Sequence, residues 1–467
     1  MQNTLKSTFN SLAVHKIITS VILVLVAVKL TAQDPAKVLS SVYGEALGDR
    51  TAYKNLEYLC KKTKGRIDGS AEAGKAVEFT MQALINAGAD TVWLQKVKVP
   101  HWVRGNEKCV VRSSVNGKKD LRITALGLSV GTSDRGITSH IVEVHNFDEL
   151  KSLGFSKIHG KIVFFNRPFD NTLINSFAGY GGAVNQRSMG ASEASRYGAK
   201  GVIVRSVTPS LDNFPHTGVM HYSDSVNKIP AVAVSTLDAE LLSKWLKSDS
   251  SLSVHLISTC KTLPDTWSYN VIGEIRGDVK PEEFITVGGH LDAWDIGEGA
   301  HDDGGGCVQA IETIRIFKKL GIKPKRTIRA VMFMNEEMSS TGGRTYASEA
   351  KRKNEIHYAA LESDRGVMSP RGFSFDADGL RLDKLQALAS WFAPYDIKDF
   401  DKGGGGSDIS PLKSLGALQI GYIPDSQRYF SYHHSANDTF EQVNIRELQM
   451  GSATIASLIY LIDMFDL

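Results

Sequence analysis

The chain has 467 residues, of which 42% are hydrophobic and 22% are charged, an ordinary composition for a globular protein. Its length favours two or three domains over a single one. The formal net charge of +3 is small, and positive and negative residues alternate along the chain. Nucleic-acid binders concentrate basic residues on one face, so we expect no nucleic-acid partner.

The N-terminus differs from the rest of the chain. Basic residues precede an aliphatic run over 17–28, which is too short to cross a hydrocarbon core of about 30 Å, and small residues follow before Gln33. This order is typical of a secretory signal peptide, which we predict at residues 1–32. The mature protein is then exported, periplasmic or secreted, with no membrane contact after cleavage. A short membrane anchor is the alternative, because Lys29 interrupts the small residues.

The region before residue 117 combines helices and strands. Residues 36–87 are mostly helical in pattern, and residues 91–99 are strand-like. Two further apolar runs, 110–115 and 121–126, flank Asn116-Gly117. That dipeptide accepts the positive φ of a type I′ turn, so we predict a β-hairpin there.

Residues 117–262 contain short apolar strands separated by many turns. The runs 162–165 and 202–204 are typical of buried strands, and 192–197 is predicted as a helix that stops at Gly198. We interpret this region as a separate, β-rich insert domain.

Strands and helices alternate after residue 269, which indicates an α/β domain with a largely parallel central sheet flanked by helices. The catalytic domain would therefore combine residues 33–116 with residues 263–467 around the insert. The predicted strands are 284–287, 327–334, 358–361 and 418–423, and a helix over 308–320 ends before Gly321.

Residue types that bind metals follow each predicted strand of this last region. Since functional residues collect at the carboxyl ends of parallel strands, we expect these side chains to converge. A single such residue is more simply a helix cap or a solvated loop residue, but the recurrence at four strand ends favours a metal site. The residues are His290, Asp292, Asp302, Asp303, Glu336, Glu337, Asp364, His433 and His434.

Charge counting suggests two cations. Asp302, Glu337 and Asp364 carry three negative charges, and neutral His290 and His434 carry none. Two divalent ions with one hydroxide would neutralise them. Two imidazoles with three carboxylates suit zinc, although cobalt or manganese also binds mixed nitrogen and oxygen ligands.

Five motifs in the same order resemble the cocatalytic dizinc exopeptidases, a family that includes bacterial aminopeptidases and glutamate carboxypeptidase. The stretches 288–306 and 98–104 are similar to the carboxypeptidase Q branch of that family. The motifs are Gly-Gly-His-Leu-Asp at 288–292, His-Asp-Asp-Gly at 301–304, Asn-Glu-Glu at 335–337, Glu-Ser-Asp at 362–364 and His-Ser-Ala-Asn-Asp-Thr at 434–439.

The resemblance implies a zinc exopeptidase fold with an inserted protease-associated domain, and two Zn²⁺ ions per chain. His290 and Asp364 would hold one zinc, Glu337 and His434 the other, and Asp302 would bridge both.

The resemblance also implies three further roles. Glu336 would be the general base, and Asp292 would hydrogen-bond the far nitrogen of His290. In many relatives a tyrosine immediately before the last histidine ligand stabilises the oxyanion through its hydroxyl. Here His433 holds that position and would donate a similar hydrogen bond, with Tyr432 one residue earlier. A cis peptide is expected between Asp302 and Asp303.

The predicted function is an exported exopeptidase that hydrolyses short peptides, as a dipeptidase or carboxypeptidase of the carboxypeptidase Q type. The alternatives are an aminopeptidase of the same family, a catalytically inactive binding module, and an acyl transferase related to glutaminyl cyclases, which work with one zinc. Arg365 or Lys402 could read a terminal carboxylate, and Glu298 or Asp295 a terminal amine. The sequence leaves the recognised terminus, a homodimer and the pairing of four cysteines open.

Overall fold

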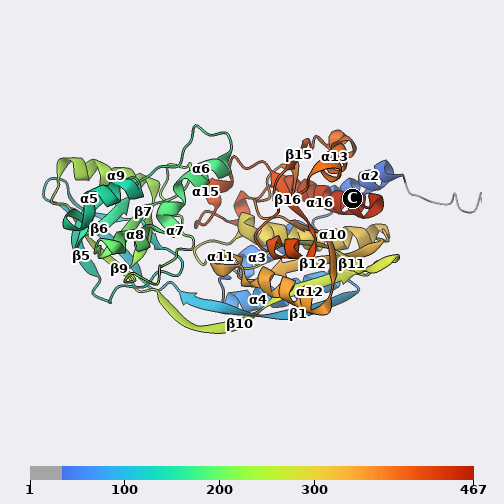
Figure 1. The fold of residues 1–467 in the computed structure, drawn as a ribbon, viewed down its shortest axis with the longest axis horizontal. Helices are drawn as coiled ribbons and strands as arrows, with labels where there is room; N and C mark the ends of the chain where they lie inside the picture. Colours follow the sequence, from blue (N-terminus) through green and yellow to red (C-terminus); the bar gives the residue numbers. More distant parts are fainter. Residues whose placement is uncertain (1–33) are drawn as a thin grey trace, which may run out of the picture. The chain divides into compact units, whose positions relative to one another are not determined.

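The computed structural model describes residues 34–467, and the predicted signal peptide lies outside the described residues. Two eight-stranded sheets form the framework (Figure 1). The four central strands of the first sheet are parallel, and antiparallel strands complete both of its edges. In spatial order its strands are β1 (Thr91–Val103), β10 (Lys261–Ile275), β12 (Arg326–Phe333), β11 (Lys280–His290), β13 (Ile356–Glu362), β16 (Leu418–Pro424), β14 (Pro370–Phe375) and β15 (Asp399–Lys402).

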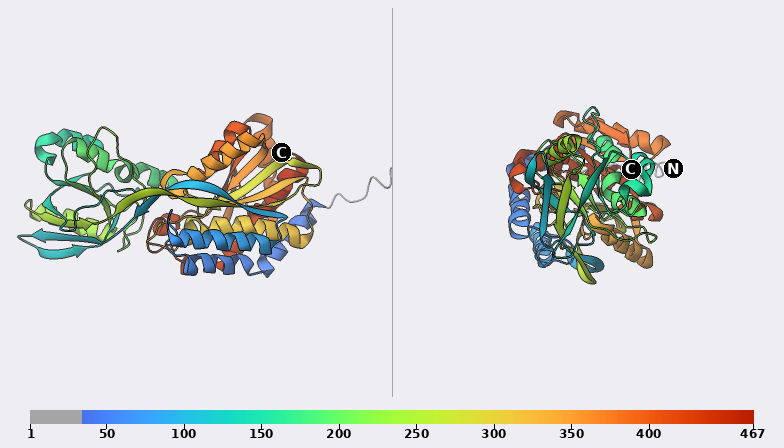
Figure 2. Two further views of the ribbon diagram at one scale, coloured as in Figure 1. Left: turned by 90° about the horizontal axis from the view of Figure 1, so that it is seen from below. Right: turned by 90° about the vertical axis from the view of Figure 1, so that its left-hand side faces the viewer.

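Helices cover both faces of the first sheet (Figure 2). One face is covered by α3 (Thr51–Lys62), α4 (Ala71–Ala87), α10 (Gly305–Leu320) and α16 (Ile445–Phe465), and the other by α12 (Thr341–Lys353) and the 3₁₀ helix η3 (Ser410–Leu415). The predicted α/β fold with a largely parallel centre is confirmed. The remaining helices of this part are α2 (Pro35–Gly48), α11 (Glu336–Ser339), α13 (Gly379–Ala387), α14 (Ala389–Phe392), α15 (Tyr429–Tyr432), η1 (Ala300–Gly304), η2 (Ala393–Tyr395) and η4 (Phe440–Gln442).

Local sequence signals set several helix ends. Ser70 caps α4, since its hydroxyl accepts a hydrogen bond from the backbone N–H of Ala73 at 3.0 Å. Gly88 ends the same helix with φ 89°, and Gly321 ends α10 with φ 64°. These left-handed conformations suit glycine, and the predicted end of the helix before Gly321 is confirmed.

Among the described residues, α16 is the helix whose length and composition would allow it to cross a membrane. However, 83% of its most apolar window is buried inside the protein. It packs against α10 and α3, so its apolar sequence is explained by its place in the core.

The second sheet has helices on both faces as well. Val163 and Phe165 of β6 pack with one buried cluster, whereas Ile162 and Phe164 pack with the cluster on the opposite face. The strand is therefore apolar on both sides, as predicted from its continuous apolar run. In spatial order the strands are β3 (Gly117–Leu121), β2 (Glu107–Ser113), β9 (Ser253–Ser258), β5 (Ile137–Val144), β6 (Ile162–Phe165), β7 (Gly201–Arg205), β8 (Ala231–Val234) and β4 (Ile123–Ala125); the helices are α5 (Phe147–Ile158), α6 (Ser176–Ala183), α7 (Asn185–Ser188), α8 (Gly190–Arg196) and α9 (Thr236–Ser248).

The predicted hairpin exists, but its turn and second strand were predicted wrongly. β2 pairs with β3, and Ser113 lies opposite Gly117. Of the two residues predicted at the turn, Gly117 has a positive φ, 83°, and Asn116 does not, which excludes a type I′ turn. The strands are joined instead by the three residues 114–116, and the left-handed Gly117 follows them at the start of β3. Residues 123–125 belong to β4, which pairs with β8 instead.

The two sheets are joined by β1 and β10, which pair antiparallel along nearly their whole length (Figure 2). The second-sheet strands lie between Glu107 and Ser258, so β2 precedes the start predicted for the insert. The division of the chain into a catalytic domain and an insert stays a proposal. All four cysteines lie in the described part of the chain and are free, buried thiols.

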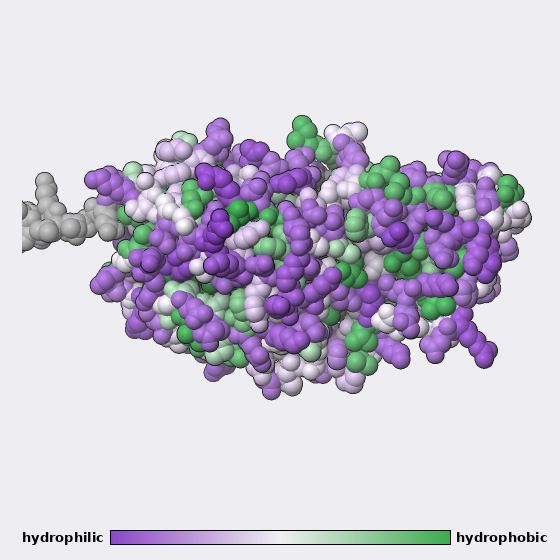
Figure 3. All heavy atoms as spheres, turned by 180° about the vertical axis from the view of Figure 1, so that it is seen from behind, coloured by the Kyte–Doolittle hydropathy of each residue, from purple (hydrophilic) through white to green (hydrophobic). Residues whose placement is uncertain are grey.

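Hydrophobic side chains on the face seen in Figure 3 form small areas separated by hydrophilic ones. Scattered exposure of this kind is normal for a folded protein and indicates no particular partner.

Candidate metal centre

The predicted ligands lie where the central strands end. His290 is the last residue of β11, and Glu336 and Glu337 begin α11 directly after β12. Asp364 follows β13, and the pair His433-His434 follows α15. Asp302 lies in η1, between β11 and α10, and a cis peptide joins it to Asp303, as the resemblance implied.

The first group consists of His290, Asp302 and Asp364, whose ligand atoms lie within 4.8 Å of one another. Nε2 of His290 is 3.1 Å from Oδ1 of Asp302 and 3.5 Å from Oδ1 of Asp364. Nδ1 of the same ring is 3.0 Å from the backbone carbonyl of Asp292. A carbonyl can only accept, so Nδ1 carries a proton, and in a neutral ring the lone pair is on Nε2.

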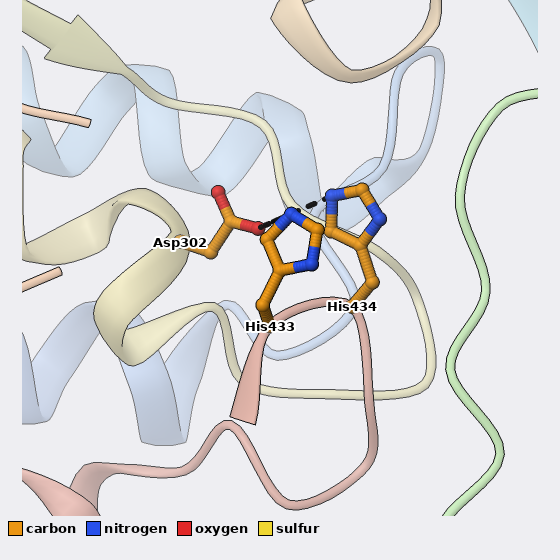
Figure 4. A group of neighbouring side chains, drawn as sticks. All are labelled: Asp302, His433 and His434. Carbon is orange, nitrogen blue, oxygen red and sulfur yellow. Dashed lines mark ion pairs between the residues drawn. The ribbon is translucent and has the colours of Figure 1, made fainter. Parts of the chain in front are cut away.

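The second group consists of Asp302, His433 and His434. Oδ2 of Asp302 is 3.2 Å from Nε2 of His434 and 3.6 Å from Nε2 of His433 (Figure 4). Glu337 joins them, since its Oε2 is 3.0 Å from Nε2 of His434. The two imidazoles are stacked with their centroids 3.5 Å apart. Asp302 therefore directs one oxygen toward each group.

Asp292 acts differently from the expectation. Its carboxylate Oδ1 is 3.9 Å from Nδ1 of His290, too far for a hydrogen bond, and it is the backbone carbonyl that contacts the ring. The carboxylate instead accepts hydrogen bonds from the backbone N–H groups of Asn335, Glu336 and Glu337, at 2.7, 3.1 and 3.2 Å. These three donors, at the N-terminal end of α11, outcompete the imidazole for the carboxylate. Asp292 thus holds the turn that presents both glutamates.

Two further carboxylates hold the segment around Asp302, and the sequence reasoning did not assign them this task. Asp438 accepts from the backbone N–H groups of His301 and Asp302, at 2.8 and 3.2 Å. Asp303 accepts from the N–H groups of His290 and Gly306, at 3.0 and 2.9 Å. Asp438 belonged to a recognised motif, but no local signal pointed to a contact this distant in sequence.

Glu336 lies beside both groups. Burial raises its pKa to about 8, and Asp364 and Glu337 add to the effect. The hydroxyl of Ser407 donates to its Oε1 at 2.5 Å. A carboxyl group held this way is suited to taking up and releasing a proton.

The side chains present fit divalent cations. Oδ2 of Asp302 and Oε1 of Glu337 are buried and have no hydrogen-bond partner among the described residues. Burial opposes charge on His290, yet the carboxylates of Asp364 and Asp302 raise its pKa well above its ordinary value. These carboxylates therefore favour a positive charge at Nε2, which a proton supplies in the absence of metal and which a bound divalent cation can supply in its place.

A cavity of about 410 Å³ opens onto these residues. Helices beside the second sheet and a helix of the first-sheet region both line it. The residues are Phe177, Tyr180 and Arg187 from α6 and α7, and Tyr429 and Phe430 from α15. The ring of Tyr180 stacks on that of Phe430, with centroids 4.6 Å apart. The second sheet and its helices therefore narrow the space in front of the candidate ligands.

Three of the four charged residues proposed to read a peptide terminus have partners elsewhere. Arg104 binds Asp295 through two nitrogens, at 2.6 to 3.0 Å. Glu298 accepts from Lys61 at 2.9 Å. Lys402 is exposed and paired with Asp378. Each of these three charged groups is therefore paired within the protein and needs no substrate terminus as a partner.

Comparison with known proteins agrees with this geometry. Residues 270–459 match the model of peptidase family M28. The chain is 34% identical to carboxypeptidase Q from Bos taurus over 422 residues, which cover 90% of this chain and 87% of the relative. The human carboxypeptidase Q gives the same identity and coverage. This chain belongs to peptidase family M28.

Solved structures support the family assignment. A peptidase M28 precursor from Shewanella amazonensis SB2B is 32% identical, with a TM-score of 0.87 over 92% of this chain and 96% of that one. A zinc aminopeptidase from Bacillus subtilis shares the fold at 19% identity, with a TM-score of 0.64 over 88% of this chain and 94% of that one. The M28 chain described here is a hydrolase that acts on peptide bonds, so its predicted enzyme class is confirmed.

Proposed function

We propose that the protein is a dizinc exopeptidase of the carboxypeptidase Q type. His290 and Asp364 would hold one zinc ion, Glu337 and His434 would hold the other, and Asp302 would contribute to both sites. The observation that carries the proposal is that Asp302 belongs to both groups of candidate ligands.

Two zinc ions bound there would lower the pKa of a water molecule and stabilise the negative charge that develops on the substrate carbonyl oxygen. Glu336 would act as the general base, taking a proton from water and returning it to the leaving amine, and the hydroxyl of Ser407 donates a hydrogen bond to one of its carboxylate oxygens. Asp292 keeps Glu336 and Glu337 in place through the backbone. His433 donates a hydrogen bond to the developing oxyanion, in the position that tyrosine occupies in many relatives.

The cavity favours short peptides. Its volume of about 410 Å³ accommodates a few residues, and side chains of α6 and α7 line it. Water exclusion by the same walls strengthens electrostatic interactions with the substrate. The two relatives named above, both 34% identical to this chain, are carboxypeptidases by name, which favours cleavage at the C-terminus.

A digestion series of peptides from two to about twenty residues tests this function. We expect dipeptides to be cleaved fastest and longer peptides to lose single C-terminal residues at falling rates, as followed by mass spectrometry. Peptides with an amidated C-terminus should resist, and N-acetylated ones should not. Internal cleavage of the longer peptides with dipeptides left intact would contradict the proposal.

Export is part of the proposal and has its own test. Amino-terminal sequencing of the protein recovered from the periplasm or medium should give a mature chain that begins at or near Gln33. Recovery of exported protein that still contains residues 17–28 would show an anchor.

A further inference from the structure

The loop that carries His433 and His434 is bound along its backbone by a segment next to the second sheet, His216-Thr217. The N–H of Thr217 donates to the backbone carbonyl of His434 at 2.8 Å. Nδ1 of His216 donates to the carbonyl of His433 at 2.6 Å. His216 and Ser435 also form an antiparallel β-bridge. These contacts fix the loop from a part of the chain more than two hundred residues away.

The same segment contacts the ring of His434. Nδ1 of His434 lies 3.4 Å from the carbonyl oxygen of Thr217 and 3.4 Å from Nη1 of Arg187, which donates to the same oxygen at 3.3 Å. When Nδ1 carries the proton and donates it to that carbonyl, the ring presents the lone pair of Nε2 to Glu337 and Asp302, at 3.0 and 3.2 Å. A backbone carbonyl is a usual partner for the far nitrogen of a metal-binding histidine.

The segment can hold the ring because it is itself fixed. Thr217 is fully buried, and its hydroxyl donates to the carbonyl of Ala125 in β4 at 2.7 Å. The N–H of His216 donates to the hydroxyl of Ser206 at 2.8 Å, and that hydroxyl donates to Val234 in β8 at 2.7 Å. Two strands of the second sheet therefore brace the segment.

We propose that His216 and Thr217 are positioning residues that align His434, and with it one of the two metal sites. The inference rests on the proposed function. The other site does not depend on this segment, since the far nitrogen of His290 is held by Asp292, at the end of its own strand. The second sheet would therefore be needed to form one metal site as well as to narrow the cleft.

The test is the affinity of each site for zinc, measured on the full chain by competition with a chromophoric chelator. His216→Phe keeps a buried ring and removes the donor; it costs little elsewhere, because Nε2 of His216 has no hydrogen-bond partner among the described residues. We expect one of the two dissociation constants to rise by about 10–100-fold and the other to stay within about threefold. His216→Asn, which places an amide N–H near the position of Nδ1, should restore most of the affinity.

His140→Phe is the matched control, because His140 is an exposed histidine of β5 in the same sheet. It should change neither constant. Thr217→Val removes only the hydrogen bond to Ala125 and should weaken the same single site by a smaller factor. It replaces His216→Phe in the test if that variant does not fold. Unchanged constants in these variants, or equal weakening of both sites, would overturn the inference while leaving the proposed function intact. A wild-type protein with fewer than two zinc sites would overturn both.

Discussion

Replacing Glu336 with glutamine is expected to lower kcat by at least the ~10²–10⁴-fold typical of losing a general base. The amide has nearly the same shape and can still accept the hydrogen bond from Ser407, but it cannot take a proton from water. The backbone N–H of residue 336 still binds Asp292, so the turn and its neighbour Glu337 should stay in place. Steady-state kinetics on a dipeptide, with metal analysis of the same sample, gives both quantities.

The expected combination is a low kcat with an unchanged metal content. Glu337→Gln should instead lose metal, because a charged ligand beside His434 is removed. Glu78→Gln, on the exposed face of α4, is the control and should behave as wild type. Near-wild-type kcat in Glu336→Gln would refute the mechanism even if both metals are bound.

Asp302→Asn is expected to weaken both metal sites and abolish measurable activity. Burial opposes charge on this carboxyl, yet the adjacent imidazoles of His290 and His434 hold its pKa well below its ordinary value. An amide removes the negative charge that both groups share, so the loss of affinity at each site should exceed the ~10–100-fold seen for outer contacts. Chelator competition on the purified variant measures it.

Two further variants test whether the effect of Asp302→Asn comes from the loss of a shared ligand. His434→Ala removes a ligand of one group only and should weaken mainly one site. Asp401→Asn changes an exposed carboxylate of β15 and should have no effect. If Asp302→Asn lost a single metal and His434→Ala lost the same one, Asp302 would not be shared.

Features set by local sequence could be predicted. The apolar strands, the glycine helix ends and the polar residues after each strand depend on neighbours within a few positions. The convergence of these residues followed from strand order, since parallel strands end at one edge. The bridging role of Asp302 was implied by the family resemblance and stays a prediction.

Features set by distant contacts could not be predicted. The carboxylate of Asp292 accepts from the backbone N–H groups after β12 rather than from His290. The guanidinium of Arg104 forms an ion pair with the carboxylate of Asp295. The contact of His216 with His433 joins two parts of the chain that share no local pattern. The turn type at Asn116-Gly117 was predicted wrongly for a different reason, because the same dipeptide is compatible with loops of more than one length.

The central claim is that one buried aspartate joins two metal sites in a peptidase. Metal analysis of the purified wild-type chain, by mass spectrometry of the elements bound per protein molecule, tests it most directly. We expect two zinc ions per chain. A strong chelator should remove both ions and the activity, and added zinc should restore both. One tightly bound ion, or none in an active preparation, would contradict it.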